Sequence, residues 1–194
     1  MEARPDRFTV FLDANVLVPA LTRNLILSLA DKDRFRICWS ARVLDEFECA
    51  FLKVIPQESP ERARKQRDAM MKAFPHACVS GYEALEPAFA SGPDRNDAHV
   101  MAAAQHCGAD VIVTDNLKDF PAAMLQPLAI EALSADHFIA DAIDLDQDLA
   151  VAAIGAMRLR LKNPEITATS LLDKMRARGL RQSADLLDVY RAHL

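Results

Sequence analysis

Phe-Thr-Val-Phe-Leu-Asp-Ala-Asn-Val-Leu, residues 8–17, sets the organisation of this chain. Its first five residues are apolar or β-branched, which is typical of a short strand buried inside a parallel sheet. The strand ends at a carboxylate, Asp13. Ligands collect at the carboxyl ends of strands in open α/β sheets, so Asp13 is a candidate site residue. On this stretch alone a second role stays open, because Asp13 or Asn15 can also cap a helix that starts near Val16.

Strand-like and helix-like segments alternate after this stretch, which predicts βαβ units and a parallel sheet. The further predicted strands are residues 36–39, 77–79, 109–114 and 128–132. The predicted helices are one through the twenties, one over 41–54 capped by Ser40, one from Pro60 to about Phe74, and one that follows the loop 91–97 and ends near Gly108. The sequence therefore predicts an α/β fold.

Beyond Ser134 the sequence is almost wholly helical, with caps at Ser134 and at Thr167 or Thr169. A stop at Gly179 is followed by a restart at Ser183. We therefore predict two parts, an α/β domain over residues 1–133 and a helical C-terminal extension over residues 134–194.

The predicted extension is polarised, because acidic residues come first and a basic run from Arg158 to Arg181 follows. Such a surface can bind RNA through its basic half or dock a partner protein. The turn at Gly179 fits a DNA-reading helix-turn-helix as well as generic packing of two helices. Both interpretations stay open.

Composition narrows the class of protein. The chain has 194 residues, of which 51% are hydrophobic, and its net charge of −5 argues against a general nucleic-acid coat. Its four cysteines show no CxxC spacing, which predicts reduced thiols and a cytoplasmic location. We find no signal-peptide pattern at the N-terminus and no apolar run of membrane-spanning length, so no membrane partner is expected.

Four acidic residues lie where a parallel sheet would bring them to one edge: Asp13, Glu46, Asp97 and Asp119. Like charges at close range raise one another's pKa, so such a cluster stays ionised only around a cation. Carboxylate oxygens suit Mg²⁺ or Mn²⁺, and sites of this kind act on phosphate esters. His99 follows Asp97 by two positions, and helical geometry turns it away, which favours an exposed or core histidine.

Four motifs resemble those of the PIN-domain ribonucleases, in the order that this family has. They are Leu-Asp-Ala-Asn-Val-Leu at 12–17, Ser40 with Val43, Leu44 and Glu46, Asp-Ala-His-Val-Met-Ala-Ala-Ala at 97–104, and Val-Thr-Asp-Asn-Leu-Lys-Asp-Phe at 113–120. The resemblance covers roughly residues 8 to 130, and the combination is more specific than any single motif. It implies a three-layer α/β/α PIN-like domain with a central parallel sheet.

The resemblance also implies site residues. The first three acids of the family carry over onto Asp13, Glu46 and Asp97, which are the expected metal ligands. The family often has Thr-x-Asp after its late strand, and here Asn116 takes the place of that acid. Asn116 and Asp119 are three residues apart, so one helical turn puts both on the same face. An amide brings no charge, so the number of bound metal ions, one or two, stays open.

Many members of the family are toxins of bacterial toxin-antitoxin pairs, often called VapC-like. The resemblance therefore implies a Mg²⁺- or Mn²⁺-dependent endoribonuclease that cleaves single-stranded RNA with a water that the metal activates. The expected catalytic residues are Asp13, Glu46, Asp97, Asn116 and Asp119. The expected partners are the RNA and an antitoxin protein, and a homodimer is a further candidate.

Two other functions stay open at this point. A phosphatase of the haloacid-dehalogenase type also has an aspartate after its first strand, and Asp13 would be its covalent nucleophile. That chemistry needs a second acid two residues later, where this chain has Asn15. The other alternative is a non-catalytic module whose acids bind a partner or a structural cation.

Overall fold

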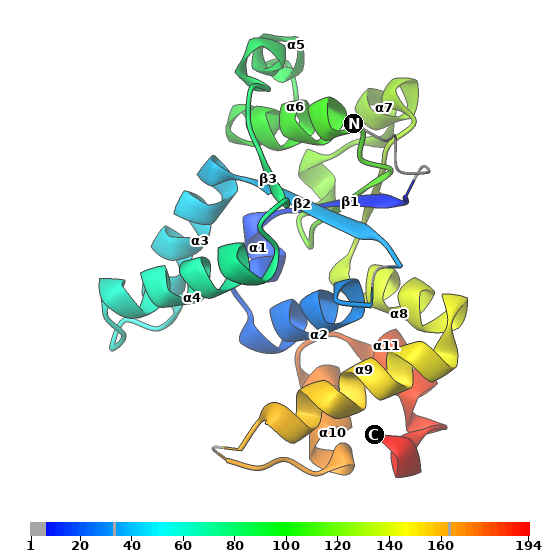
Figure 1. The fold of residues 1–194 in the computed structure, drawn as a ribbon. Coiled ribbons are helices and arrows are strands. Elements are labelled where there is room, and N and C mark those ends of the chain that lie inside the picture. Colours follow the sequence, from blue (N-terminus) through cyan, green and yellow to red (C-terminus); the bar gives the residue numbers. More distant parts are fainter. Residues whose placement is uncertain (1–6, 33, 163) are drawn as a thin grey trace. The chain divides into compact units, whose positions relative to one another are not determined.

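A computed structural model describes residues 7–32, 34–162 and 164–194 of the chain (Figure 1). The chain divides into two compact units. The first contains Met1–Val18 and Phe35–Leu133, and the second contains Pro19–Arg34 and Ser134–Leu194. The site that the sequence predicts lies wholly in the first unit.

The first unit is built on a five-stranded parallel sheet with the strand order β3-β2-β1-β4-β5. The strands are β1 (Thr9–Leu12), β2 (Arg36–Ser40), β3 (Cys78–Val79), β4 (Val111–Val113) and β5 (Glu131–Leu133). All residues of β1 are buried because this strand lies at the centre of the sheet. The predicted α/β class and parallel sheet are confirmed.

Helices cover the sheet on both sides, which gives the predicted α/β/α layers (Figure 1). In this view α5 (Glu86–Phe89), α6 (Ala98–Cys107) and α7 (Ala122–Leu125) lie on one side, and α1 (Ala14–Leu17), α3 (Ala41–Val54) and α4 (Pro60–Ala73) on the other. Short 3-10 turns are η1 (Glu83–Leu85), η2 (Arg95–Asp97), η3 (Leu117–Asp119) and η4 (Gln126–Leu128). In such a fold helix N-termini and strand C-termini meet at one edge of the sheet.

Local sequence signals account for most helix ends. The Ser40 hydroxyl accepts a hydrogen bond from the Val43 amide at 3.1 Å and so caps α3, as predicted. Gly108 ends α6 in the left-handed conformation, with φ 64°. The last strand begins later than the predicted 128–132, because η4 and the left-handed Ala129 (φ 55°) occupy that stretch.

The second unit is all-helical. Its elements are α2 (Ala20–Ala30), α8 (Ala135–Leu145), α9 (Gln147–Arg160), α10 (Ala168–Ala177), α11 (Arg181–Asp188) and the 3-10 turn η5 (Arg191–His193). Helix α2 packs against α8 and α9, although more than a hundred residues separate them in sequence. The Arg160 guanidinium donates to the Ser28 hydroxyl at 3.1 Å, and Arg34 forms an ion pair with Asp146. Deleting 134–194 would therefore strip α2 of its packing partners.

One carboxylate holds the start of α11. Asp136 on α8 accepts hydrogen bonds from the backbone amides of Gln182 (3.0 Å) and Ser183 (2.9 Å). The Ser183 hydroxyl lies 2.8 Å from the same carboxylate, and Ser183 is fully buried. Leu180, at the N-cap position of α11, offers no side-chain cap. Asp136 therefore supplies from another helix the cap that α11 lacks.

We predict that Asp136→Ala lowers the free energy of unfolding by about 1–3 kcal/mol, because it leaves the backbone amide of the buried Ser183 unpaired. Chemical denaturation of wild type and variant measures this difference. Asp141→Ala, an exposed position on the same helix, is the matched control and should change stability by less than about 0.5 kcal/mol. Equal losses in the two variants would show that Asp136 is not a specific cap.

Candidate metal centre

Asp13 follows β1 directly and is 6% exposed. Its Oδ1 accepts a hydrogen bond from the Ala14 amide at 2.6 Å, so it caps α1. Its Oδ2 accepts from the Thr114 hydroxyl at 2.7 Å and from the Asn15 amide group at 2.5 Å. The two roles that the sequence left open are therefore combined in one residue, a helix cap that is also a buried acid at the end of the central strand.

Burial raises the pKa of the Asp13 carboxyl above its usual value. The hydrogen bonds from Thr114 and Ala14 act in the opposite direction, and the charge of Glu46 raises the pKa further. The net direction is upward. A buried carboxyl with an acidic neighbour therefore lies at the end of this strand, and a cation beside it would favour its charged form.

Glu46 projects from α3, and its side chain is 40% exposed. Its Oε1 lies 3.6 Å from Nε of Arg42 and 2.9 Å from Nε2 of His99. His99 is fully buried, in keeping with a core histidine, but it is not turned away from the acids. Asp97 precedes the first residue of α6, so the helical rotation assumed for the step from Asp97 to His99 does not apply.

Asp97 ends η2 and stands immediately before α6. Burial, followed by the charges of Asp13, Asp94 and Asp119, raises the pKa of Asp97 to about 6. Burial first, and then the neighbouring acids, therefore disfavour the charged form of Asp97.

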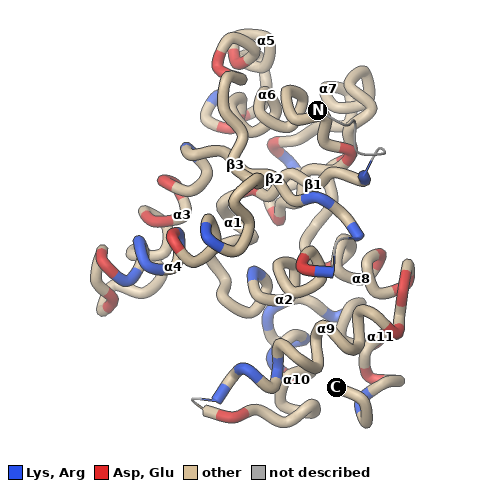
Figure 2. Tube along the Cα trace, viewed as in Figure 1, with Lys and Arg blue, Asp and Glu red and all other residues tan. Residues whose placement is uncertain are grey.

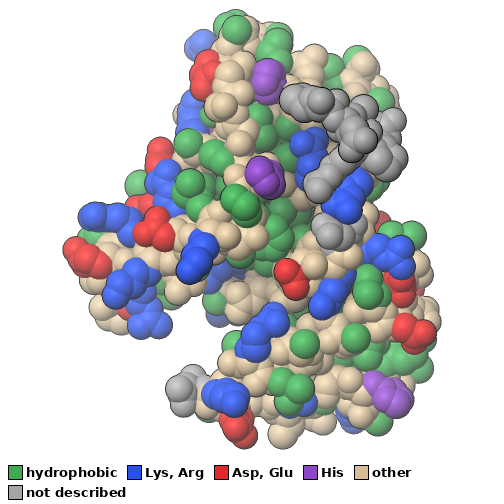
Figure 3. Space-filling view, in the orientation of Figure 1, with side chains coloured by type: hydrophobic (Ala, Val, Ile, Leu, Met, Phe, Trp, Pro, Cys, Tyr) green, Lys and Arg blue, Asp and Glu red, His purple; other side chains and the backbone are tan. Residues whose placement is uncertain are grey.

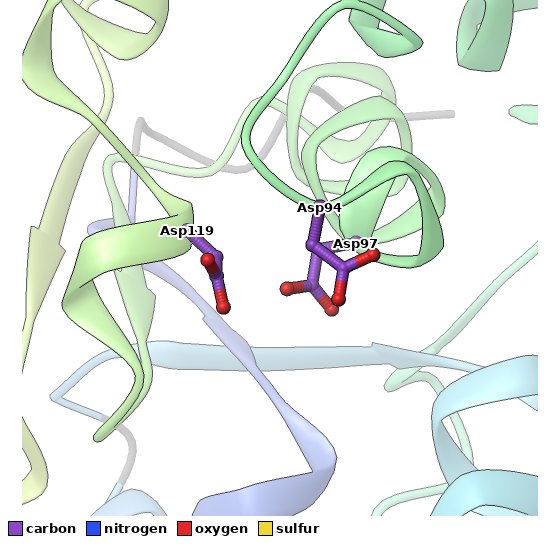
Figure 4. A group of neighbouring side chains, drawn as sticks. All are labelled: Asp94, Asp97 and Asp119. Atoms are coloured by element: carbon purple, nitrogen blue, oxygen red, sulfur yellow. The ribbon is translucent and has the colours of Figure 1, made fainter.

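Asp119 lies on η3 after β4 and is 9% exposed. One carboxylate oxygen each from Asp94, Asp97 and Asp119 lies within 4.8 Å of the others (Figure 4). Figure 4 shows Asp94 and Asp97 on the segment before α6 and Asp119 facing them from η3. The Asn116 amide donates to the Asp119 carboxylate, so these two predicted site residues do lie together.

Asp94 is the acid that the sequence analysis missed. It sits in the loop 91–97, where its side chain accepts a hydrogen bond from the Asn96 amide at 2.8 Å. Gly, Pro and Asp are ordinary loop residues, so the pattern alone gives no reason to single it out. The one available signal is its position three residues before Asp97, one turn of helix away.

Asn15 ties two strand ends together. Its amide group donates to Thr114 at 2.8 Å as well as to Asp13, and its carbonyl oxygen accepts from the Asp115 amide at 3.0 Å. The backbone N–H of Asn116 donates to the Thr114 hydroxyl at 3.1 Å. The loop after β4 is thereby fixed beside the end of β1, and Asp115 itself is exposed.

The five predicted site residues thus come from β1, α3, the start of α6 and the turn after β4. Asp13 and Glu46 interact electrostatically, as do Asp13 and Asp97, and Asp97 and Asp119. Their donor atoms are carboxylate and amide oxygens, which fit Mg²⁺ or Mn²⁺. Within residues 7–32, 34–162 and 164–194 the one candidate ligand group of three or more residues is Asp94, Asp97 and Asp119. It contains Asp97 but not the predicted ligands Asp13 and Glu46, and it is all carboxylate, which does not suit zinc.

Two arginines of α4 form ion pairs with nearby acids. On α4, Arg62 pairs with Glu58 at 3.2 Å, and Arg67 pairs with Asp45 at 2.6 Å and Glu48 at 2.9 Å. Figure 2 shows acidic and basic residues interspersed along α3 and α4, and Figure 3 shows side chains of both charges next to one another in this region. This region is a surface of mixed charge, not a continuous basic track.

Among the described residues no helix is long and apolar enough to cross a membrane.

Comparison with known proteins gives matches to both units. A family model described as "PIN domain" matches residues 9–118, and one described as "VapC50 C-terminal domain" matches residues 135–188. The chain is 44% identical over 79 residues to a protein of Mycobacterium tuberculosis named "Putative ribonuclease VapC50". The alignment covers 41% of this chain and 47% of that relative, so the chain spans about half of its length. No solved structure matches the chain.

The match to the PIN model covers more than half of the 194 residues. It contains the first three motifs in full and residues 113–118 of the fourth. It agrees with the five-stranded parallel sheet of the first unit. The chain belongs to the PIN-domain family and carries a C-terminal domain of the VapC50 type.

Proposed function

We propose that this protein is a metal-dependent endoribonuclease that cleaves single-stranded RNA and acts as the toxin of a bacterial toxin-antitoxin pair. One observation carries the proposal: acids from separate segments lie close together, with carboxylate oxygens of Asp94, Asp97 and Asp119 within 4.8 Å of one another. Asp13 is near enough that its charge raises the pKa of Asp97. Membership of the PIN family and the name of the M. tuberculosis relative support a nuclease.

The Asp13 carboxylate is held in a fixed orientation without a bound metal ion. Three hydrogen bonds, from Ala14, Asn15 and Thr114, fix its carboxylate at the end of the central strand. A carboxylate that is already oriented does not have to be reorganised when charge develops beside it. We assign Asp13 as a main metal ligand on this basis. We assign Asp97 as the other because its charge interacts with that of Asp13 and its carboxylate lies beside those of Asp94 and Asp119.

Glu46 completes the proposed ligand set from α3. Both of the contacts that the described residues make with its carboxylate involve Oε1, from Arg42 and His99. Oε2 is therefore available to position the metal or to accept a proton from the attacking water. Asn116 and Asp119, joined by their own hydrogen bond, would orient a second ion or its waters.

A divalent ion held there would neutralise charge on the scissile phosphate and activate water for attack. Asp94 lies within reach of Asp97 and Asp119 and adds a charge that Asn116 does not bring. We therefore include Asp94 among the residues that would hold a second ion.

The phosphatase alternative finds no support in the geometry. It needs a proton-donating acid two residues after Asp13, and Asn15 there is engaged with Asp13, Thr114 and the Asp115 amide. A neutral amide held by these contacts cannot serve as a general acid. A non-catalytic module would have the same acids, so the cleavage assays below separate it from the nuclease.

An antitoxin protein is the partner that we propose with the toxin role, and a homodimer stays a candidate. A small adjacent reading frame with a DNA-binding N-terminus, co-expressed with this chain, would test it: co-purification and loss of cleavage are expected. The described cysteines Cys38, Cys49, Cys78 and Cys107 are all free thiols, in keeping with our proposal of a cytoplasmic protein.

The pKa of Asp97 gives a prediction for stability. In metal-free protein its folded pKa of about 6 exceeds the ordinary 3.8, so its stabilising contribution is present below pH about 4 and is lost as pH rises through 6. The unfolding temperature of wild type should therefore fall as the pH rises from about 4 to 6. Asp97→Asn should reduce this fall. Added Mn²⁺ should also reduce it, because the ion replaces the proton.

Asp115→Asn is the control for the pH experiment, because Asp115 is exposed at the same edge of the sheet. Its unfolding temperature should follow the wild-type pH dependence. Parallel pH curves for wild type and Asp97→Asn, with no effect of Mn²⁺, would contradict the repulsion that we describe.

For catalysis we predict that Asp13→Asn or Asp97→Asn lowers the RNA cleavage rate on the order of a hundredfold or more. Asparagine keeps the size of the side chain and removes its charge, so at Asp97 the change tests electrostatics. At Asp13 it also replaces one hydrogen-bond acceptor by a donor, because both carboxylate oxygens accept hydrogen bonds there. Asp115→Asn should have little effect. Rates on structured and unstructured RNA, with Mn²⁺ and with chelator, measure this; cleavage that survives chelation or both substitutions would refute the proposed function.

A further inference from the structure

His99 is a buried polar group that the proposed function has not used. Its side chain has no exposed surface, and it lies in the first turn of α6, two residues after Asp97. The surrounding residues of this helix, Ala98 and Val100 to Ala104, are all buried and apolar. An aliphatic side chain would fill this position without the desolvation cost of two ring nitrogens.

The contact that His99 makes is with the proposed ligand Glu46. Nε2 lies 2.9 Å from Glu46 Oε1, which is a hydrogen-bond distance, although the present orientation gives neither ring nitrogen a well-aligned hydrogen bond among the described residues. The imidazole is enclosed, whereas the Glu46 side chain is 40% exposed. The carboxylate is therefore the partner that can rotate into alignment, and the imidazole is the fixed one. Catalytic hydrogen bonds are often loose in this way before ligands bind.

We propose that His99 is a positioning residue, whose Nε2 holds Oε1 of Glu46 and thereby presents Oε2 to the metal. This inference rests on the proposed function, since it assigns a role toward the ion that Asp13, Glu46 and Asp97 would hold. Substituting a group that orients a metal ligand typically weakens metal affinity about 10–100-fold. Glu46 needs such a group because it reaches the site from a partly exposed position on α3.

Arg42 is the other contact of Glu46, and it differs from His99 in a way that the test can use. Its guanidinium lies 3.6 Å from the same Oε1, one helical turn away on α3, and its side chain is 44% exposed. Exposed pairs of this kind fix geometry poorly because both side chains keep their freedom in water. Arg42→Gln is therefore a matched control for loss of a Glu46 contact.

The test compares two substitutions that differ in where they place a donor. In His99→Gln the amide nitrogen can reach the position of Nε2, whereas in His99→Asn it reaches only that of Nδ1. We expect His99→Asn to weaken Mn²⁺ binding on the order of tenfold, His99→Gln to stay within about threefold of wild type, and Arg42→Gln to change little. Calorimetric titration with Mn²⁺ measures these affinities, and kcat for RNA cleavage should follow them while KM for RNA does not.

A double-mutant cycle separates positioning from general damage to the fold. If His99 acts through Glu46, then His99→Asn should have no further effect on Mn²⁺ affinity in a Glu46→Gln background. Equal affinities of the Gln and Asn variants, or an undiminished effect of His99→Asn without Glu46, would overturn the positioning role while wild type still binds metal. Wild type that binds no Mn²⁺ would overturn both this role and the proposed function.

Discussion

The burial of Asp13 at the end of the central strand is the constraint on which the rest of the site depends. A carboxylate in that position is costly, and the chain offsets the cost with the Ala14 amide, the Thr114 hydroxyl and the Asn15 side chain. Thr114 and Asn15 also join the ends of the neighbouring strands β1 and β4. The hydrogen bonds that stabilise the buried Asp13 carboxylate therefore also fix the edge of the sheet beside which the other acids lie.

Repulsion among those acids is the second consequence of this arrangement. The raised pKa values of Asp13 and Asp97 mean that the metal-free site holds its charge at the expense of stability. A bound divalent cation would turn this destabilising effect of the charges into a stabilising one. The site would then be most stable with the ion bound, which is the state in which it is proposed to work. Local destabilisation at a functional site of this kind is common in enzymes.

Much of this could be predicted from sequence because the signals are local. The alternation of strand-like and helix-like segments predicted the parallel sheet, and Ser40 and Ser134 marked helix starts at which the serine side chain accepts a backbone hydrogen bond. The packing of α2 with α8 and α9 could not be predicted, since a helical stripe shows that a face is buried but not against which element.

The site shows the same limit at the level of single residues. Asp13, Glu46, Asp97, Asn116 and Asp119 stand in motifs, and their assignment as catalytic and metal-binding residues remains our proposal. Asp94 lies in a loop whose composition is ordinary, and His99 lies where a cap and a helix meet, so ideal helical rotation misplaces it. Both become visible only when segments distant in sequence come together.

The most direct measurement of the central claim is the location of the ion itself. Crystals grown with Mn²⁺ and measured at an energy where manganese scatters anomalously would reveal its position without reference to activity. The account predicts a peak at the carboxyl edge of the sheet, at about 2.0–2.3 Å from carboxylate oxygens of Asp13 and Asp97, since such distances are typical for small divalent cations. A saturated crystal with no manganese at this edge, or with manganese bound only elsewhere, would contradict it.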